Sequence, residues 1–113
     1  MLPQRLRLRR SAEFASVIHT GRKVRRQTLV LYAASAVSPR FGVIVGKKVG
    51  NAVARNLVKR RLRHQAAALL DEAGPMDVVV RALPGAAQSG HRLRGDMTSA
   101  WQKAAQMATE SVS

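Results

Sequence analysis

Apolar residues in the first part of the chain predict one short helix followed by strands. Phe14, Val17 and Ile18 recur at helical spacing and predict a helix over about 12–20. Ser11 is the expected N-cap, and Gly21 marks the expected end of this helix.

Two β-rich segments follow, at 28–33 and 41–45. Because Ser38 and Pro39 lie between them, the simplest prediction is an antiparallel pair of strands joined by a short loop. The pattern does not settle whether 22–26 forms a separate strand.

In the second half, the pattern predicts a helix over about 52–70, then a strand at 76–82 and a final helix at 96–108. The first of these helices gathers one apolar side, formed by Ala54, Val58, Leu62 and Leu69. The strand is apolar enough at 78–80 to be internal to a sheet. The final helix could begin as early as Ser89, because the pattern at 83–95 is hard to assign.

This order of elements predicts a single α+β domain over residues 1–113. Residues 1–10 are basic and expected to be irregular, and 109–113 are expected to form a flexible tail. Trp101 has helical spacing from Met97 and Ala105 and is the expected core anchor of the last helix.

Charge changes this picture most around the helix at 52–70. The segment 47–63 has seven Lys and Arg residues, and the segment 14–70 has twelve of them and no Asp or Glu. Like charges four residues apart on a helix cost roughly 0.2–0.5 kcal/mol per pair, and Arg55, Lys59 and Arg63 form two such pairs. With a net charge of +14 on the whole chain, we expect this helix to meet its counter-charge on a nucleic acid.

A nucleic-acid interface is favoured over a solvated surface helix, because a solvated face would ordinarily carry acidic residues as well. Charge alone does not choose between the groove of DNA and the phosphates of folded RNA. A membrane-surface role is a weaker alternative, since the apolar side of the helix is needed for the core. No apolar run approaches the ~20 residues of a membrane span, and the arginine-rich N-terminus is not typical of a secretory signal.

The sequence gives little support for catalysis by the protein itself. The three His residues have no metal-ligand spacing, and there is no Cys. Six scattered acidic residues are a thin supply for the carboxylates of a two-metal nuclease site. The segment 42–47 falls one residue short of a P-loop and lacks its Ser or Thr. We therefore predict no catalytic and no metal-binding residue in the protein.

The run from Val45 to Arg63, VGKKVGNAVARNLVKRRLR, resembles the RNR motif of the protein subunit of bacterial ribonuclease P. The resemblance extends in order over nearly the whole chain. Its further matches are Arg7-Leu8, Glu13-Phe14, Leu29–Tyr32 and Met76–Arg81.

The resemblance implies a mainly antiparallel four-stranded sheet with the basic helix in a left-handed β-α-β crossover, in a ribosomal-protein-like two-layer sandwich. It implies a cytoplasmic ribonucleoprotein in which the protein binds a catalytic RNA and the 5′ leader of precursor tRNA. Endonucleolytic cleavage of that leader would be carried out by the RNA, with Mg²⁺ bound mainly by the RNA and the substrate. The resemblance implies no protein partner.

The resemblance also assigns roles to ten positions. The residues expected to face the catalytic RNA are Arg55, Asn56, Lys59, Arg60 and Arg63. Those expected to line the leader-binding cleft, between the first helix and the sheet and at the strand-to-helix junction, are Phe14, Ile18, Tyr32, Lys47 and Lys48.

Two positions depart from the family pattern. Leu57 replaces the last Arg of the Arg-Asn-Arg triplet, and Ile18 stands where an aromatic residue often occurs. Without the resemblance, Phe14 and Tyr32 would be assigned to the core, because a stacking platform needs an exposed ring beside a basic groove. A ribosomal-type structural RNA binder without a substrate cleft, and a protein that is itself a nuclease, are the rival functions.

Overall fold

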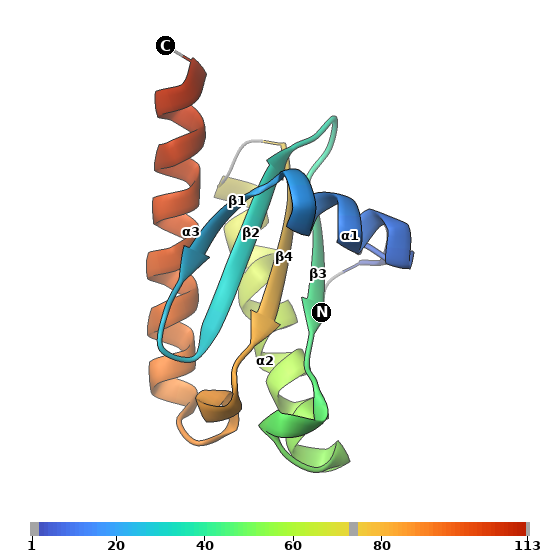
Figure 1. Ribbon diagram of the computed structural model, residues 1–113, viewed down its shortest axis with the longest axis vertical. Coiled ribbons are helices and arrows are strands. Elements are labelled where there is room, and N and C mark those ends of the chain that lie inside the picture. Colours follow the sequence, from blue (N-terminus) through green and yellow to red (C-terminus); the bar gives the residue numbers. More distant parts are fainter. Residues whose placement is uncertain (1–2, 73–74, 113) are drawn as a thin grey trace.

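The computed structural model describes residues 3–72 and 75–112. The described residues form three α-helices, which lie around one sheet (Figure 1). In chain order the elements are η1 (Gln4–Leu6), α1 (Ser11–Thr20), β1 (Arg22–Arg25), β2 (Leu29–Ser35), β3 (Arg40–Ile44), η2 (Lys47–Val49), α2 (Ala52–Glu72), β4 (Met76–Ala82), η3 (Pro84–Ala87) and α3 (Gly90–Val112).

The four strands form one mixed sheet in the order β1-β2-β4-β3. The pairs β1–β2 and β2–β4 are antiparallel, and β3–β4 is parallel. The predicted antiparallel pairing of the segments at 28–33 and 41–45 is therefore wrong, because β4 lies between β2 and β3. Val78, Val79 and Val80 are fully buried, and a strand that is apolar on both faces is stable in this interior position.

The crossover from β3 through α2 to β4 is left-handed, as the resemblance implied. In Figure 1, β3 and β4 both run downwards with β4 to the left of β3, while α2 returns upwards behind the sheet. The rule that parallel crossovers are right-handed would have given the opposite arrangement.

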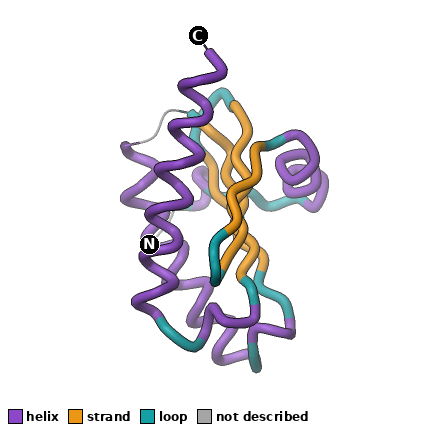
Figure 2. The backbone as a smooth tube through the Cα atoms, turned by 60° about the vertical axis from the view of Figure 1, so that its left-hand side comes forward, coloured by secondary structure: helices purple, strands orange, loops and turns teal. Residues whose placement is uncertain are grey.

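Helices cover the two faces of the sheet unequally (Figure 2). We call the face under α2 and α3 the back face, and the face under α1 the front face. The back face and its two helices form the larger core, in which Trp101 is buried as predicted and its ring centroid lies 6.1 Å from that of Phe41. The sheet with α2 and α3 is the expected two-layer sandwich, and α1 adds a short third layer at the front.

Polar contacts fix α1 on the front face. The Glu13 carboxylate accepts hydrogen bonds from the backbone N–H groups of Arg9 and Arg10 and pairs with the Arg40 guanidinium. Arg40 also donates two hydrogen bonds of 3.0 Å to the Asp77 carboxylate. The three side chains thus connect α1 to β3 and β4.

Several element boundaries differ from the predictions. Arg10 is the N-cap of α1, and Ser11 is its first helical residue. The unassigned segment 83–95 contains η3 and the start of α3, and 22–25 does form a strand. The opening segment is partly regular, because η1 precedes a bridge between Arg7 and Phe41 on β3. α3 extends through most of the expected tail.

Candidate nucleic-acid interface

The start of α2 is set by two residues that precede it. Gly50 has a φ of 154°, which L-residues rarely adopt, so glycine permits the sharp entry into the helix. The Asn51 side-chain oxygen accepts a hydrogen bond of 2.9 Å from the Ala54 N–H, as an N-cap does. The orientation of the basic helix is thereby fixed by the segment that leaves β3.

The helix α2 packs on the back face through the fully or almost fully buried side chains of Val58, Leu62, Ala66 and Leu70. The predicted apolar side is thus correct at Val58 and Leu62. Leu69 is half-buried and packs against the same core, and Ala54 is half-buried. The residues predicted to face the catalytic RNA all reach the surface: Asn56 and Arg60 are exposed, and Arg55, Lys59 and Arg63 are half-buried. We call these five residues the motif face.

Among the described residues, no ion pair joins the motif face to an acidic side chain. Partial burial lowers the pKa of the Arg63 guanidinium, and the positive charge of Arg7 lowers that pKa further. Arg7 comes from the segment beside β3, so the N-terminal region contributes to the same basic surface. The Arg55 Nε is buried and has no hydrogen-bond partner among the described residues. These features favour an anion at this surface.

Lys47 and Lys48 lie in η2, between the end of β3 and the start of α2, and both are exposed. They therefore occupy the strand-to-helix junction that the resemblance implied. Gly42, which contacts the ring of Phe14, precedes Lys47 by five residues. At ~3.3 Å per residue, Lys47 lies at most roughly 16 Å along the chain from that contact, and Lys48 is one residue further.

The three apolar residues predicted for the leader cleft come together on the front face. Phe14, Ile18 and Tyr32 belong to one cluster. Phe14 and Ile18 are half-buried, but Tyr32 is only 7% exposed, so its ring is mostly core. A Cβ at Gly42 would lie 2.5 Å from the Phe14 ring, which shows how closely α1 approaches the sheet. Of the two predicted aromatic platforms, Phe14 alone presents substantial surface.

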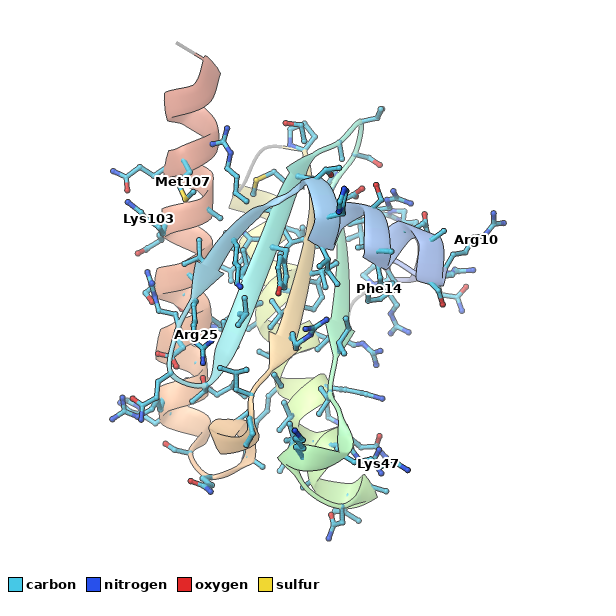
Figure 3. All side chains as sticks on the ribbon, viewed as in Figure 1. Arg10, Phe14, Arg25, Lys47, Lys103 and Met107 are labelled. Atoms are coloured by element: carbon cyan, nitrogen blue, oxygen red, sulfur yellow. The ribbon has the colours of Figure 1, made fainter. Side chains whose placement is uncertain are left out.

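The sheet register reveals front-face cations that the sequence analysis missed. Directly paired residues point to the same face. The row Arg25, Val30, Arg81 and Ile44 therefore lies on the front face, with Lys23 in the neighbouring row beside Tyr32. Lys23, Arg25 and Arg81 are all exposed. Figure 3 shows Arg25 near the end of β1, Phe14 beside α1 and Lys47 by η2, spread over this front surface.

These cations have a weak signal in the sequence. In β1, Val24 between Lys23 and Arg25 is the apolar residue of a strand alternation, but the segment is too short for the pattern to decide. Arg81 interrupts an otherwise apolar end of β4. We call Phe14, Ile18, Lys23, Arg25 and Arg81 the front-face residues.

Two further observations concern the described part of the chain. It contains no group of three or more His, Cys, Asp or Glu side chains that could hold a metal ion. Within the same residues, no helix is both long enough and apolar enough to cross a membrane.

Comparisons with known proteins agree on one family. A family model described as Ribonuclease P matches residues 2–105. A ribonuclease P protein component from Mycobacterium sp. (strain KMS) is 43% identical over 92% of this chain and 93% of its own length. One from Pseudarthrobacter chlorophenolicus is 49% identical over 88% of this chain and 77% of its own length.

Solved structures show the same fold. The RNase P protein of Staphylococcus aureus superposes with a TM-score of 0.81 at 25% identity, over 88% of this chain and 94% of that one. The RNase P protein of Thermotoga maritima gives a TM-score of 0.75 at 20% identity, over 86% and 96% of the two chains.

Proposed function

The chain belongs to the ribonuclease P protein family, the protein components of an endoribonuclease that processes the 5′ end of tRNA, and we propose how its two basic surfaces divide the RNA between them. The motif face of α2 binds the catalytic RNA subunit. The front-face residues, with Lys47 and Lys48 beyond the end of β3, bind the single-stranded 5′ leader of precursor tRNA.

The observation that carries this proposal is the separation of the two surfaces by the sheet. The motif face lies on a helix of the back layer, whereas Lys23, Arg25 and Arg81 project from the front of the sheet. A half-buried aromatic ring on the same face of the sheet as exposed cations is suited to a single strand, because bases stack on the ring and phosphates meet the charges. A structural RNA binder with one interface would not need the second surface.

The hydrolysis of the phosphodiester is assigned to the RNA. Mg²⁺, held mainly by the RNA subunit and the substrate, would activate the attacking water and stabilise charge on the leaving oxygen. The cations of this chain reduce the repulsion between leader and RNA subunit and hold the leader in place. A cytoplasmic location follows from this assignment, since tRNA precursors and the RNA subunit would meet the protein there.

Reconstitution with a bacterial ribonuclease P RNA tests the proposal. At a low Mg²⁺ concentration at which the RNA alone is nearly inactive, adding the protein should restore cleavage of a precursor tRNA at its mature 5′ end. RNA-free protein should give no turnover. Binding of the RNA without restored cleavage would support the structural RNA binder, and multiple-turnover cleavage by the protein alone would support the protein nuclease.

A further inference from the structure

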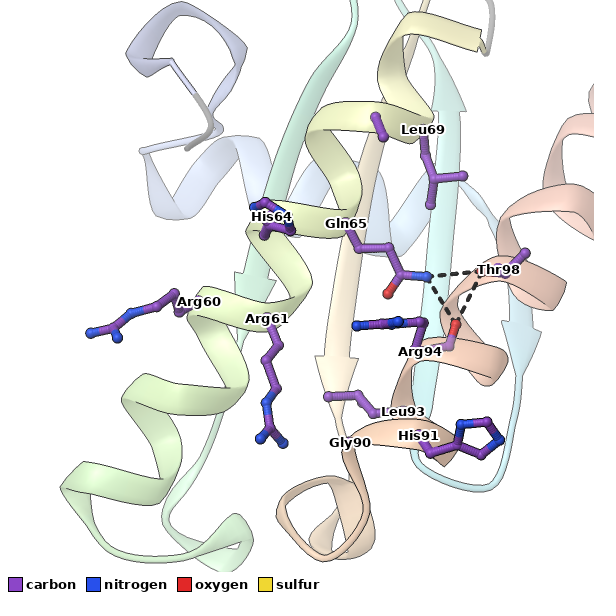
Figure 4. Close-up of a pocket in the computed structure, with 11 residues that line it drawn as sticks. Arg60, Arg61, His64, Gln65, Leu69, Gly90, His91, Leu93, Arg94 and Thr98 are labelled. Atoms are coloured by element: carbon purple, nitrogen blue, oxygen red, sulfur yellow. Dashed lines mark hydrogen bonds between the residues drawn. The ribbon is translucent and has the colours of Figure 1, made fainter.

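A groove between α2 and α3 carries cations that neither surface above uses. Its volume is about 850 Å³, and its described lining includes three Arg and two His side chains and no acid. Figure 4 shows that Arg61 of α2 and Arg94 of α3 extend into the space between the two helices, whereas Arg60 and His91 point away from it.

Arg61 stands apart from the other cations of α2. At 100° per residue it is rotated by about 200° from both Lys59 and Arg63, so it faces α3 and not the motif face. The start of α3 passes close to it, since a Cβ at Gly90 would lie 2.7 Å from a guanidinium nitrogen of Arg61. The absence of a side chain at position 90 leaves room for the guanidinium at this place.

The opposite wall of the groove is held in a fixed position. The Gln65 side-chain amide donates hydrogen bonds of 2.9 Å to the Arg94 carbonyl and to the Thr98 hydroxyl oxygen. These bonds tie α2 to α3 at the residue that carries the second guanidinium. The groove is therefore present before any ligand binds.

The chemistry of the groove fits a sugar–phosphate backbone. Guanidinium groups bind phosphate oxygens through paired N–H donors, and two of them face this groove from different helices. The N-terminal end of α3, which begins at Gly90, adds partial positive charge. The half-buried Leu69 gives the groove apolar surface against which a ribose or base can pack.

We propose that this groove binds the backbone of the catalytic RNA and extends the RNA interface from α2 onto α3. The groove adjoins the motif face, because Arg60 lies at its edge and directs its guanidinium towards the motif face (Figure 4). This inference rests on the proposed function, in which that RNA occupies the motif face. The RNA would contact both sides of α2, with Arg61 and Arg94 on its second side.

Binding of the catalytic RNA over a range of salt concentrations tests the groove. Arg61→Gln and Arg94→Gln should each weaken binding and reduce the slope of log affinity against log salt by up to ~0.9 for each phosphate that is no longer bound. The matched control is Lys103→Gln, which removes the same charge from an exposed position on α3. It should leave both affinity and slope unchanged. Arg63→Gln reports on the motif face in the same assay.

The outcomes distinguish a failure of the groove inference from a failure of the proposed function. If the groove variants bind like Lys103→Gln while Arg63→Gln weakens binding, the groove inference is wrong and the proposed function stands. If the wild-type protein neither binds nor activates the RNA, both are wrong. Arg94→Lys guards against misfolding, because it keeps the charge and should retain most of the salt slope without the paired N–H donors. A salt slope as low as that of Arg94→Gln would overturn the phosphate contact.

Discussion

The front and back faces of the sheet differ in how many apolar residues they bury. Among the described residues, the back face and its two helices share a cluster of 21 buried apolar residues, whereas the front cluster has five. Apolar burial stabilises a fold roughly in proportion to area, so most of the stability of this domain resides at the back. The front face is left with exposed cations and a half-buried ring, which a ligand can reach.

The two faces also differ in how their helices are attached. On the back, polar contacts supplement a continuous core; for example, Asp96 of α3 accepts hydrogen bonds of 2.8 and 2.7 Å from the N–H and hydroxyl of the buried Thr28. On the front, Glu13, Arg40 and Asp77 carry more of the attachment of α1, because few apolar residues lie beneath it. A surface for RNA can thus be varied with less risk to the fold than the back core.

Truncation in the back core should produce the largest effect. Leu62 of α2 is fully buried in the large cluster, so Leu62→Ala should lower the free energy of unfolding by roughly 2–5 kcal/mol. Leu57→Ala is the matched control, because this side chain on the same helix is 39% exposed. Its effect should stay within about 0.5 kcal/mol. Urea denaturation measures both, and similar losses of stability would contradict the assignment of stability to the back face.

Changes to the front-face residues should weaken the binding of precursor tRNA and leave the fold intact. Phe14→Leu keeps apolar packing against the sheet but removes the ring, and the stacking of one base on such a ring is worth ~1–3 kcal/mol. We expect the holoenzyme to bind precursor tRNA more weakly and mature tRNA, which has no leader, as before. Arg81→Gln should have the same selectivity because it removes a cation that meets a leader phosphate, and its binding should depend less on salt.

Val37→Ala is the control for the front-face residues, because this apolar side chain is fully exposed and is not one of them. It should change neither the affinity for precursor tRNA nor that for mature tRNA. Equally weakened binding of precursor and mature tRNA would indicate a folding defect. Unchanged binding of precursor tRNA by both Phe14→Leu and Arg81→Gln would show that the leader does not bind this face. Tyr32→Ala is a poorer probe, since a ring that is 7% exposed also supports the core.

The same contrast explains what could be predicted from the sequence. The strand at Met76–Ala82 and the long basic helix have strong local patterns, and both are confirmed within two residues. The motif residues and the family are recognisable from the sequence, because a run of cations without acidic residues depends only on neighbours along the chain. Strand order is not local: the position of β4 between β2 and β3 depends on where α2 returns the chain.

The arrangement of the front-face residues is only partly predictable for the same reason. Phe14, Ile18 and Tyr32 can be placed together by resemblance, but the alignment of Arg25 with Arg81 exists only once β2 lies between β1 and β4. The groove at Arg61 and Arg94 likewise depends on the packing of two helices whose contact no spacing in the sequence reveals. Tertiary register, not residue identity, is the missing information.

The smallest expected effect concerns the polar attachment of α1. Hydrogen bonds from the backbone of Arg10 and Arg9 and from Arg40 lower the pKa of Glu13 from 4.5 to about 2. Because the folded state has the lower pKa, the stabilisation is fully present above pH 4.5 and disappears as the pH falls towards 2. Glu13→Gln should therefore lower the melting temperature at about pH 6, and its difference from wild type should shrink steadily below about pH 4.5. Thermal melts of both proteins at several pH values measure this gap, and a gap that stays constant into strong acid would show that the Glu13 charge does not hold α1 on the front face.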